Sequence, residues 1–163
     1  MSDMSEMRAM RDTRLPDIKT LVPHAGTMSL LDSLVAADDE TLTARVAIGP
    51  DTLFCVDGAV GAWVGVEYMA QAVAAHAGYA ARQRGEPVRV GFLLGTRRYA
   101  CAVPAFAPGS QLTVHVRRAL QSDNGLGSFD CRIEDAGGAE LATASITVFQ
   151  PENVEEFLQR SSE

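Results

Sequence analysis

The hydrophobic residues of this chain divide it into strands and one long helix. Apolar and polar residues alternate at every second position in 41–48 and 111–120, which is the period of a strand with one buried face. Four further strands are expected from apolar runs that end at turn sequences: 28–35, 88–103, 126–134 and 140–149. Two turns rich in Gly, Asp and Asn, 122–125 and 135–138, predict that the last three strands form hairpins.

The segment 59–84 breaks this pattern and predicts a long helix. It contains no proline and is rich in alanine, the best helix former. At 1.5 Å per residue this helix would be about 37 Å long. It is apolar nearly all round, so we expect it to be buried, and its first half carries one ionisable residue, Glu67. Burying a carboxylate is costly unless it is paired, protonated or used, so Glu67 is a candidate functional residue.

The order of these elements indicates the fold class. Two strands precede the helix and four follow it, which is typical of an α+β arrangement. A helix that is apolar on all sides needs cover on all sides, so we expect a curved antiparallel sheet of about five to six strands to wrap round it, with a second subunit completing the cover. One domain is predicted over 16–151, with a flexible tail at 1–15 and a tail or short helix at 152–163.

The distribution of charge narrows the choice of partners. The 163 residues carry a net charge of −7, which argues against nucleic acid as the main partner. Between residues 82 and 118, however, only Glu86 opposes a set of seven arginines: Arg82, Arg84, Arg89, Arg97, Arg98, Arg117 and Arg118. This basic sector is either a surface that steers an acidic ligand or partner, or an ordinary solvated face.

Cofactor and compartment are inferred from features that the sequence lacks. The three cysteines, Cys55, Cys101 and Cys131, match no zinc or disulfide spacing and are expected to be small buried hydrophobes. The three histidines lie on separate predicted elements and no glycine-rich phosphate loop is present, so no metal and no cofactor are expected. With no membrane-spanning run and no signal-peptide core near the N-terminus, we expect a cytoplasmic protein without a membrane partner.

Two short motifs connect the chain with a known family. Pro23-His24 stands four residues before Met28, and Glu67-Tyr-Met-Ala-Gln71 lies in the predicted helix. In this order, the motifs and elements resemble the hotdog-fold 3-hydroxyacyl-acyl-carrier-protein dehydratases over about 21–150. The chain resembles in particular the small dehydratase-like proteins of aryl-polyene pigment clusters, through the further stretches 94–97, 127–131, 141–144 and 149–151.

The resemblance implies a mechanism with two catalytic groups. In such dehydratases a histidine removes the proton α to the thioester, and an acid on the helix of the other subunit protonates the departing 3-hydroxyl. The acid position falls on Glu67, whose pKa we expect burial to raise, as suits a general acid. Gln71, one helical turn further on, is expected to orient this carboxyl. Gly58 and Gly61 are expected to let the thioester approach the backbone, near the N–H groups that begin the helix.

The histidine of this mechanism is missing from its usual place. The family carries it about fourteen positions before the acid, and Leu53 stands there in this chain. We expect His76 to face away from Glu67, and His115 to be solvated on the outer side of a strand. His24 is either a structural residue or a relocated base. A second subunit that carries the histidine would also complete the site, so a homodimer and a heterodimer are both open.

Three functions agree with these residues. The first is a 3-hydroxyacyl-thioester dehydratase (a lyase) or a subunit of one, in fatty-acid or polyene-type biosynthesis. The second is a hotdog acyl thioesterase in which Glu67 is general base or nucleophile. The third is a non-catalytic partner subunit, in which Glu67 is dispensable or pairs with a buried arginine. The resemblance also implies an acyl carrier protein with its phosphopantetheine-linked acyl chain as a partner, and its candidate contacts are Arg82, Arg84, Arg97 and Arg98.

Overall fold

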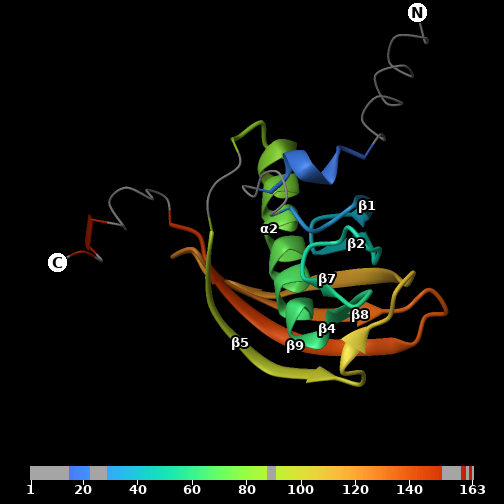
Figure 1. Cartoon of the computed structure of the whole chain (residues 1–163). Coiled ribbons are helices and arrows are strands. Elements are labelled where there is room, and N and C mark those ends of the chain that lie inside the picture. The colour runs from blue at the N-terminus through green and yellow to red at the C-terminus, as the bar shows by residue number, and fades with distance from the viewer. Residues whose placement is uncertain (1–14, 23–28, 88–90, 152–158, 161, 163) are drawn as a thin grey trace, which may run out of the picture.

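A long helix lies in the hollow of a curved antiparallel sheet (Figure 1). The structure is a computed structural model, and it describes residues 15–22, 29–87, 91–151, 159–160 and 162. The helix is α2 (Gly65–Gln83). In spatial order, the six strands of the sheet are β1 (Ser33–Ala37), β2 (Thr41–Ala47), β7 (Gln111–Gln121), β8 (Leu126–Glu134), β9 (Glu140–Phe149) and β5 (Phe92–Cys101). The predicted α+β class, with a six-stranded sheet round a central helix, is confirmed.

Two tight turns hold the middle of the sheet in register. Gly125 has a φ of 94° and its N–H bonds the Ser122 carbonyl oxygen, which closes the turn between β7 and β8. In the turn between β8 and β9, Asp135 accepts hydrogen bonds from the N–H groups of Gly137 and Ala139, both at 2.9 Å. Both hairpins predicted from turn residues are therefore confirmed, because these side chains and the glycine satisfy the turn locally.

The helix begins later than predicted. Residues 59–61 form a strand, β4 (Ala59–Gly61), which pairs with β3 (Cys55–Val56) and β6 (Ala105–Phe106) in a small second sheet. A 3₁₀ turn (Ala62–Val64) then leads into α2, which leaves a helix of about 28 Å rather than 37 Å. Pairing with β6, a segment for which no strand is predicted, overrides the local helix propensity here.

The two strands at the edges of the large sheet are shorter than predicted. β1 begins at Ser33 rather than residue 28, because the N–H of Leu30 bonds to the side chain of Gln71 instead of a neighbouring strand. β5 is described from Phe92 to Cys101, and residues 88–90 lie outside the described part. The predicted tails at 1–15 and 152–163 also lie almost wholly outside it.

One side of α2 is buried against the sheet, and the other is only half-buried in the single chain; its cover by a second subunit stays a prediction. Residues such as Tyr68, Met69 and Ala72 are fully buried against the sheet. A row of half-buried residues follows the helix at spacings of three and four: Glu67, Ala70, Ala74, Ala77 and Ala80. These positions share one face of the helix, so α2 keeps an open stripe of small side chains. No helix in the described part of the chain is long and apolar enough to cross a membrane.

The cysteines agree in part with their prediction. Cys131 is buried under the helix, and burial, with a smaller contribution from Asp130, raises the pKa of its thiol to about 12. Cys55 and Cys101 are only half-buried. All three are free thiols, and Cys131 acts as a small core residue.

Candidate functional site

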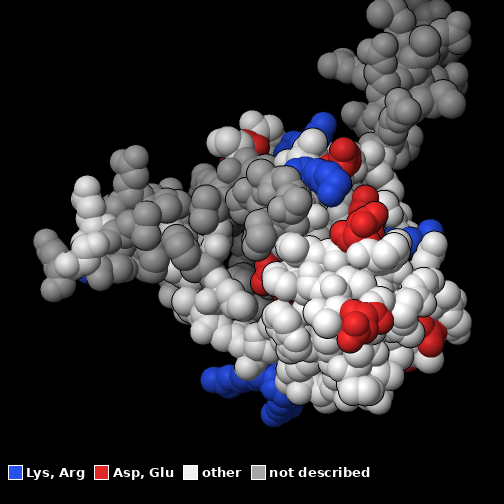
Figure 2. Space-filling view, in the orientation of Figure 1, with Lys and Arg blue, Asp and Glu red and all other residues white. Residues whose placement is uncertain are grey.

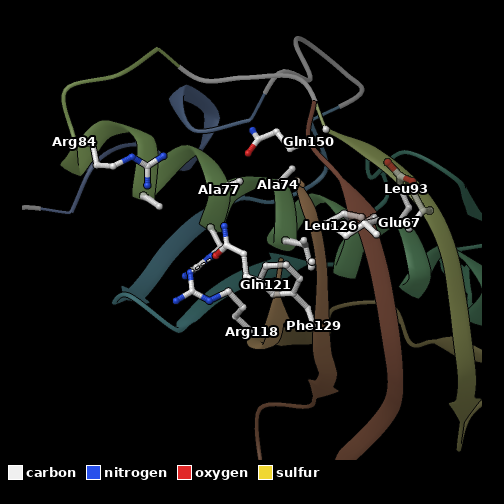
Figure 3. Close-up of a pocket in the computed structure, with 18 residues that line it drawn as sticks. Glu67, Ala74, Ala77, Arg84, Leu93, Arg118, Gln121, Leu126, Phe129 and Gln150 are labelled. Atoms are coloured by element: carbon white, nitrogen blue, oxygen red, sulfur yellow. Dashed lines mark hydrogen bonds between the residues drawn. The ribbon is translucent and has the colours of Figure 1, made fainter. Parts of the chain in front are cut away.

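A cavity of about 280 Å³ lies between the open stripe of α2 and the strands β5, β9 and β8 (Figure 3). Its helical wall includes Glu67, Val73, His76 and four alanines, and its sheet wall includes Leu93, Leu126, Phe129 and Val148. The methyl groups of the alanines occupy little volume, so a space remains between helix and sheet. The result is a long pocket with apolar walls and polar groups at its two ends.

Glu67 stands at one end of this pocket, in the first turn of α2. The side chain of Gln71 donates a hydrogen bond from Nε2 to Glu67 Oε1, at 3.1 Å. Gln71 is fully buried, and its Oε1 accepts the backbone N–H of Leu30 at 2.8 Å. Because an N–H can only donate, this bond turns the amide so that its NH₂ group faces Glu67. The geometry agrees with the predicted orienting role of Gln71.

The opposite end of the pocket carries cations and amides. Arg118 at the end of β7 donates from Nη1 to Gln121 Oε1 at 2.8 Å, as Figure 3 shows. Arg84, which follows the last turn of α2, also lines the pocket and forms an ion pair of 3.2 Å with Glu86. The two ends therefore differ in charge, with a carboxylate at one and guanidinium groups at the other.

His76 also borders this pocket, and it lies nine positions after Glu67, about halfway round the helix as predicted from its spacing. Its Nε2 lies 3.1 Å from the backbone oxygen of Asp38, and its ring packs edge-on against Phe129 with centroids 5.7 Å apart. Burial lowers its pKa, and the nearby charge of Arg118 acts in the same direction. A neutral ring bonded to a carbonyl, about 13 Å along the helix axis from Glu67, is a structural group rather than a base for that carboxyl.

The remaining predicted positions of the mechanism lie near the start of α2 or outside the described residues. Leu53 packs against the core in the segment where the family carries its histidine. Gly58 has a φ of 83° in the turn between β3 and β4, and a Cβ on Gly61 would lie 2.6 Å from Trp63 Nε1. The local structure therefore explains why glycine occurs at both positions, and neither residue lines the pocket. That they let a thioester approach the backbone stays a prediction. His24 lies outside the described residues.

The approach to α2 presents aromatic side chains to solvent. Phe54 and Trp63 meet edge to face with ring centroids 5.4 Å apart, and Trp63 remains 66% exposed. Phe54 adopts a φ of 67°, which is unusual for a bulky residue. Trp63 stands four positions before Glu67 and Phe54 thirteen, and an exposed aromatic pair with a strained backbone at Phe54 is typical of a surface that another molecule covers.

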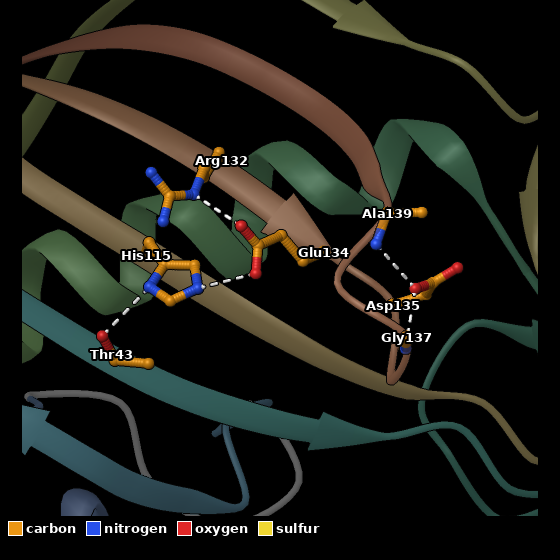
Figure 4. A network of polar contacts seen from close by, with 7 residues as sticks. All are labelled: Thr43, His115, Arg132, Glu134, Asp135, Gly137 and Ala139. Atoms are coloured by element: carbon orange, nitrogen blue, oxygen red, sulfur yellow. Dashed lines mark hydrogen bonds and ion pairs between the residues drawn. The ribbon is translucent and has the colours of Figure 1, made fainter.

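His115 is not simply solvated as predicted. It lies on the outer face of the sheet, where its Nδ1 is 3.1 Å from Thr43 Oγ1 and its Nε2 is 3.2 Å from Glu134 Oε2 (Figure 4). Arg132 donates to the other oxygen of Glu134 at 2.9 Å. Neighbouring strands bring these residues together, so the network ties β2, β7 and β8 together on the face opposite the pocket.

The four arginines predicted to bind a carrier protein fall into two separate pairs. Arg82 donates to Thr20 Oγ1 at 3.2 Å and, with Arg84, lies at the C-terminal end of α2. Arg97 and Arg98 lie midway along β5, about 16–20 Å from its start. Figure 2 likewise shows basic side chains both at the top of the molecule, where α2 ends, and at its lower edge, where β5 passes.

Sequence reasoning missed Arg118 and Gln121 as site residues. In the sequence alone, Arg118 is one of the seven cations of the basic sector. A signal was nevertheless present, because Arg118 continues the two-residue period of Leu112, Val114 and Val116, whose side chains are buried. A charged residue in the inward phase of a strand points to a polar group beneath the helix.

Comparison with known proteins agrees with this architecture. The family described as ApeP-like, ApeP dehydratase, matches residues 16–159. The chain is similar to the structure of the dehydratase heterocomplex ApeI:P from Xenorhabdus doucetiae, with 31% identity and a TM-score of 0.86, covering 92% of this chain and 100% of that chain. No curated protein matches the chain.

More distant structures are similar in fold alone. AziG from S. sahachiroi is 14% identical with a TM-score of 0.58, over 73% of this chain and 90% of that chain. A hypothetical thioesterase with coenzyme A from Streptococcus pneumoniae is 14% identical with a TM-score of 0.57, over 72% and 84%. The predicted hotdog fold is confirmed by these neighbours together with the heterocomplex.

Proposed function

The chain belongs to the ApeP-like dehydratase family, and from that premise we propose that it supplies the acid of a two-subunit 3-hydroxyacyl-thioester dehydratase. The predicted role, a dehydratase (lyase) or a subunit of one, is confirmed at the level of the family. The proposal that this chain supplies the acid rests on the position of Glu67 at one end of an apolar pocket, where Gln71 holds its carboxyl group.

Glu67 acts in this proposal as the general acid. A base removes the proton at the carbon next to the thioester, the C2–C3 double bond forms, and the 3-hydroxyl leaves as water with the proton that Glu67 donates. The thioester carbonyl faces the N–H groups that begin the helix, where the helix dipole stabilises the developing negative charge. Gln71 keeps the carboxyl directed at the leaving group, because Leu30 fixes its amide.

We place the base on a second hotdog subunit. Leu53 stands where the family carries its histidine, His76 is bonded to Asp38, and His115 lies on the opposite face of the sheet. The 31% identical structure is named a heterocomplex, which supports an assembly of two different chains. The exposed pair of Phe54 and Trp63 near Glu67 supports a partner at that end. His24, outside the described residues, is the second candidate for the base.

The substrate we propose is an acyl chain on the phosphopantetheine of an acyl carrier protein, in the synthesis of an aryl polyene or similar chain. The family name and the apolar pocket walls support this substrate class. The pair Arg97 and Arg98 on β5, and the pair Arg82 and Arg84 at the C-terminal end of α2, are two separate candidate contacts for the acidic carrier. Reversing the charge of each pair and titrating the variants with the carrier protein tests both contacts. If neither variant changes the affinity for the carrier, both pairs are excluded as its binding surface.

The experiment that tests the function follows the mass of an acyl group. A 3-hydroxyacyl-carrier protein is incubated with the purified chain, alone and with a candidate partner subunit. We expect loss of one water when both subunits are present, and a rate at least about a hundredfold lower in Glu67→Gln. The matched control is Glu40→Gln, which removes a carboxylate that pairs with Arg117 at the surface, at 3.7 Å.

Each alternative has its own outcome in this experiment. Release of free thiol would mean a thioesterase instead. Dehydration that survives Glu67→Gln unchanged would mean a non-catalytic subunit and would overturn the proposed acid. Dehydration by the chain alone would point to His24 as the base and exclude the need for a partner histidine.

A further inference from the structure

An arginine occupies an inward position of the sheet at the end of the pocket remote from Glu67. Along β7 the residues that face α2 are Leu112, Val114, Val116 and then Arg118, and the first three are buried. Arg118 is half-buried and lines the pocket beside Gln121 (Figure 3). A guanidinium in such a place needs acceptors, because desolvating a charged group without partners costs free energy.

The acceptors that the described residues provide are too few for this group. In the described part of the chain, the side chain of Arg118 makes one hydrogen bond, to Gln121 Oε1, and none to a carboxylate. A guanidinium has five N–H donors and no acceptor, and this bond occupies the oxygen of Gln121. Donors of both side chains are therefore unused, whereas neighbouring Arg84 is already paired with Glu86.

The donors of Arg118 and Gln121 lie where the end of a bound acyl chain would be if its reacting carbon lay at Glu67. Glu67 and Ala80 line the pocket 13 positions apart on α2, which corresponds to about 20 Å. Apart from His76, which is bonded to Asp38, the helical wall between them is formed by small or apolar side chains, including Ala70, Ala74 and Ala77. An acyl chain whose reacting carbon lies at Glu67 would follow this wall, and its terminal group would meet Arg118.

We propose that Arg118 and Gln121 determine substrate specificity by binding the terminal group of the acyl chain, and that this group carries an oxygen acceptor: a hydroxyl, carbonyl or carboxylate. This inference rests on the proposed function, since it takes Glu67 as the place of the reacting carbon. A pocket for a chain that ends in a methyl group would be closed by apolar residues at this point. The phosphate of pantetheine offers the same acceptor chemistry, and the test separates the two sources.

Binding of unreactive substrate analogues tests the proposal. The probes are acyl-pantetheines of equal chain length with an amide in place of the thioester, ending in a hydroxyl or a methyl group, each with and without the pantetheine phosphate. Calorimetric titration of the full chain is expected to show about tenfold to a hundredfold tighter binding of the hydroxyl-ended probe. In Arg118→Met this preference should vanish while the affinity for the methyl-ended probe stays the same.

Two further variants control for folding and charge. Gln121→Leu changes an exposed residue and should also reduce the preference, by removing the partner that positions Arg118. Arg117→Met removes the adjacent cation, which is exposed and pairs with Glu40, and should leave the preference intact.

Three results would overturn the inference. The first is that the wild type binds the hydroxyl-ended and methyl-ended probes with equal affinity. The second is that Arg118→Met loses the same affinity for both probes. The third is that Arg118→Met loses affinity only for probes that carry the pantetheine phosphate, whichever group ends the chain. Because the probes do not react, these results are independent of Glu67 as the acid. If the protein does not dehydrate its substrate but still prefers the hydroxyl-ended probe, only the proposed function is contradicted.

Discussion

Two polar side chains buried on α2, Gln71 and His76, are each held by a backbone group. Leu30 donates its N–H to Gln71, and the carbonyl of Asp38 lies 3.1 Å from His76 Nε2. A carbonyl oxygen can only accept, so Nε2 carries a proton, and burial, which lowers the pKa of His76, favours the neutral ring. The fold therefore fixes both side chains. Gln71 supports Glu67, and His76 supports the connection between strands at Asp38.

At the level of single residues, we predict that His76 makes stability depend on pH. Burial lowers its pKa below the ordinary value of 6.5. As the pH falls below about 6.5, the unfolded chain therefore binds a proton that the folded chain excludes, and the free energy of unfolding decreases until the lowered pKa is reached. Urea unfolding at about pH 7 and about pH 5 should show a smaller difference in His76→Gln than in the wild type.

Carboxylates do not obscure this comparison. The pKa of Asp38 is lowered by hydrogen bonds from Glu40 and Thr41, and Glu134 also has a lowered pKa through His115 and Arg132. Glu134 lies on the outer face of the sheet and acts equally in both proteins, whereas the charge of His76 is the smallest of the causes that lower the pKa of Asp38. Equal pH dependence in variant and wild type would contradict the buried, neutral state of His76.

Among the elements, α2 is shaped by where it carries small residues. On its open stripe, alanines leave space for the pocket. On its buried side, Gly78 lets the helix approach the segment after the short helix η1 (Ile18–Thr20), because a Cβ at this position would overlap the carbonyl oxygen of Leu21. The same helix therefore uses small residues for two purposes, one for the site and one for packing.

We expect Gly78→Ala to lower the free energy of unfolding by about 3 kcal/mol or more, the upper part of the range for overpacking, although alanine is the better helix former. The obstacle is backbone rather than a flexible side chain, so either α2 or the segment at Leu21 must shift. Denaturant unfolding measures the change. Gly95→Ala on β5, where a Cβ would meet nothing within 4 Å, is the control, and equal stability of the two variants would contradict this account of the packing.

The whole molecule leaves apolar surface uncovered near the proposed acid. Val56 is 71% exposed and Trp63 66%, and both lie in the segment that leads into α2. On β5, which pairs only with β9 in the described sheet, Leu93 and Leu94 are about half-exposed. Exposed aromatic residues of this kind often contribute most of the binding energy of an interface, which agrees with a second subunit at this end.

Trp63→Ser should therefore weaken association without unfolding the chain. Loss of an aromatic anchor typically costs about 2 kcal/mol, which corresponds to about a thirtyfold higher Kd in sedimentation velocity, for the chain alone or with its partner subunit. Val35→Ser, at an exposed apolar residue on β1 at the other edge of the sheet, is the matched control. An unchanged Kd in Trp63→Ser would exclude this surface from the interface.

The sequence by itself determined the elements whose signals are local. Alternation identified β2 and β7, turn residues such as Gly125 and Asp135 located the two hairpins, and alanine content located the helix. The motif round Glu67 and Gln71 was also readable, because residues four positions apart on a helix are neighbours. Such signals depend only on residues close in sequence, which is why they survive in the folded chain.

Only the tertiary structure decided what distant segments do to one another. It turned residues 59–61 into a strand, because Ala105 and Phe106 pair with them, and it carried β5 across the helix to the far edge beside β9. It also brought Arg118 of β7 into the pocket that begins at Glu67. These outcomes depend on contacts between segments far apart in the chain. Packing of the whole core decides which of these contacts form, and no local hydrophobic period indicates them.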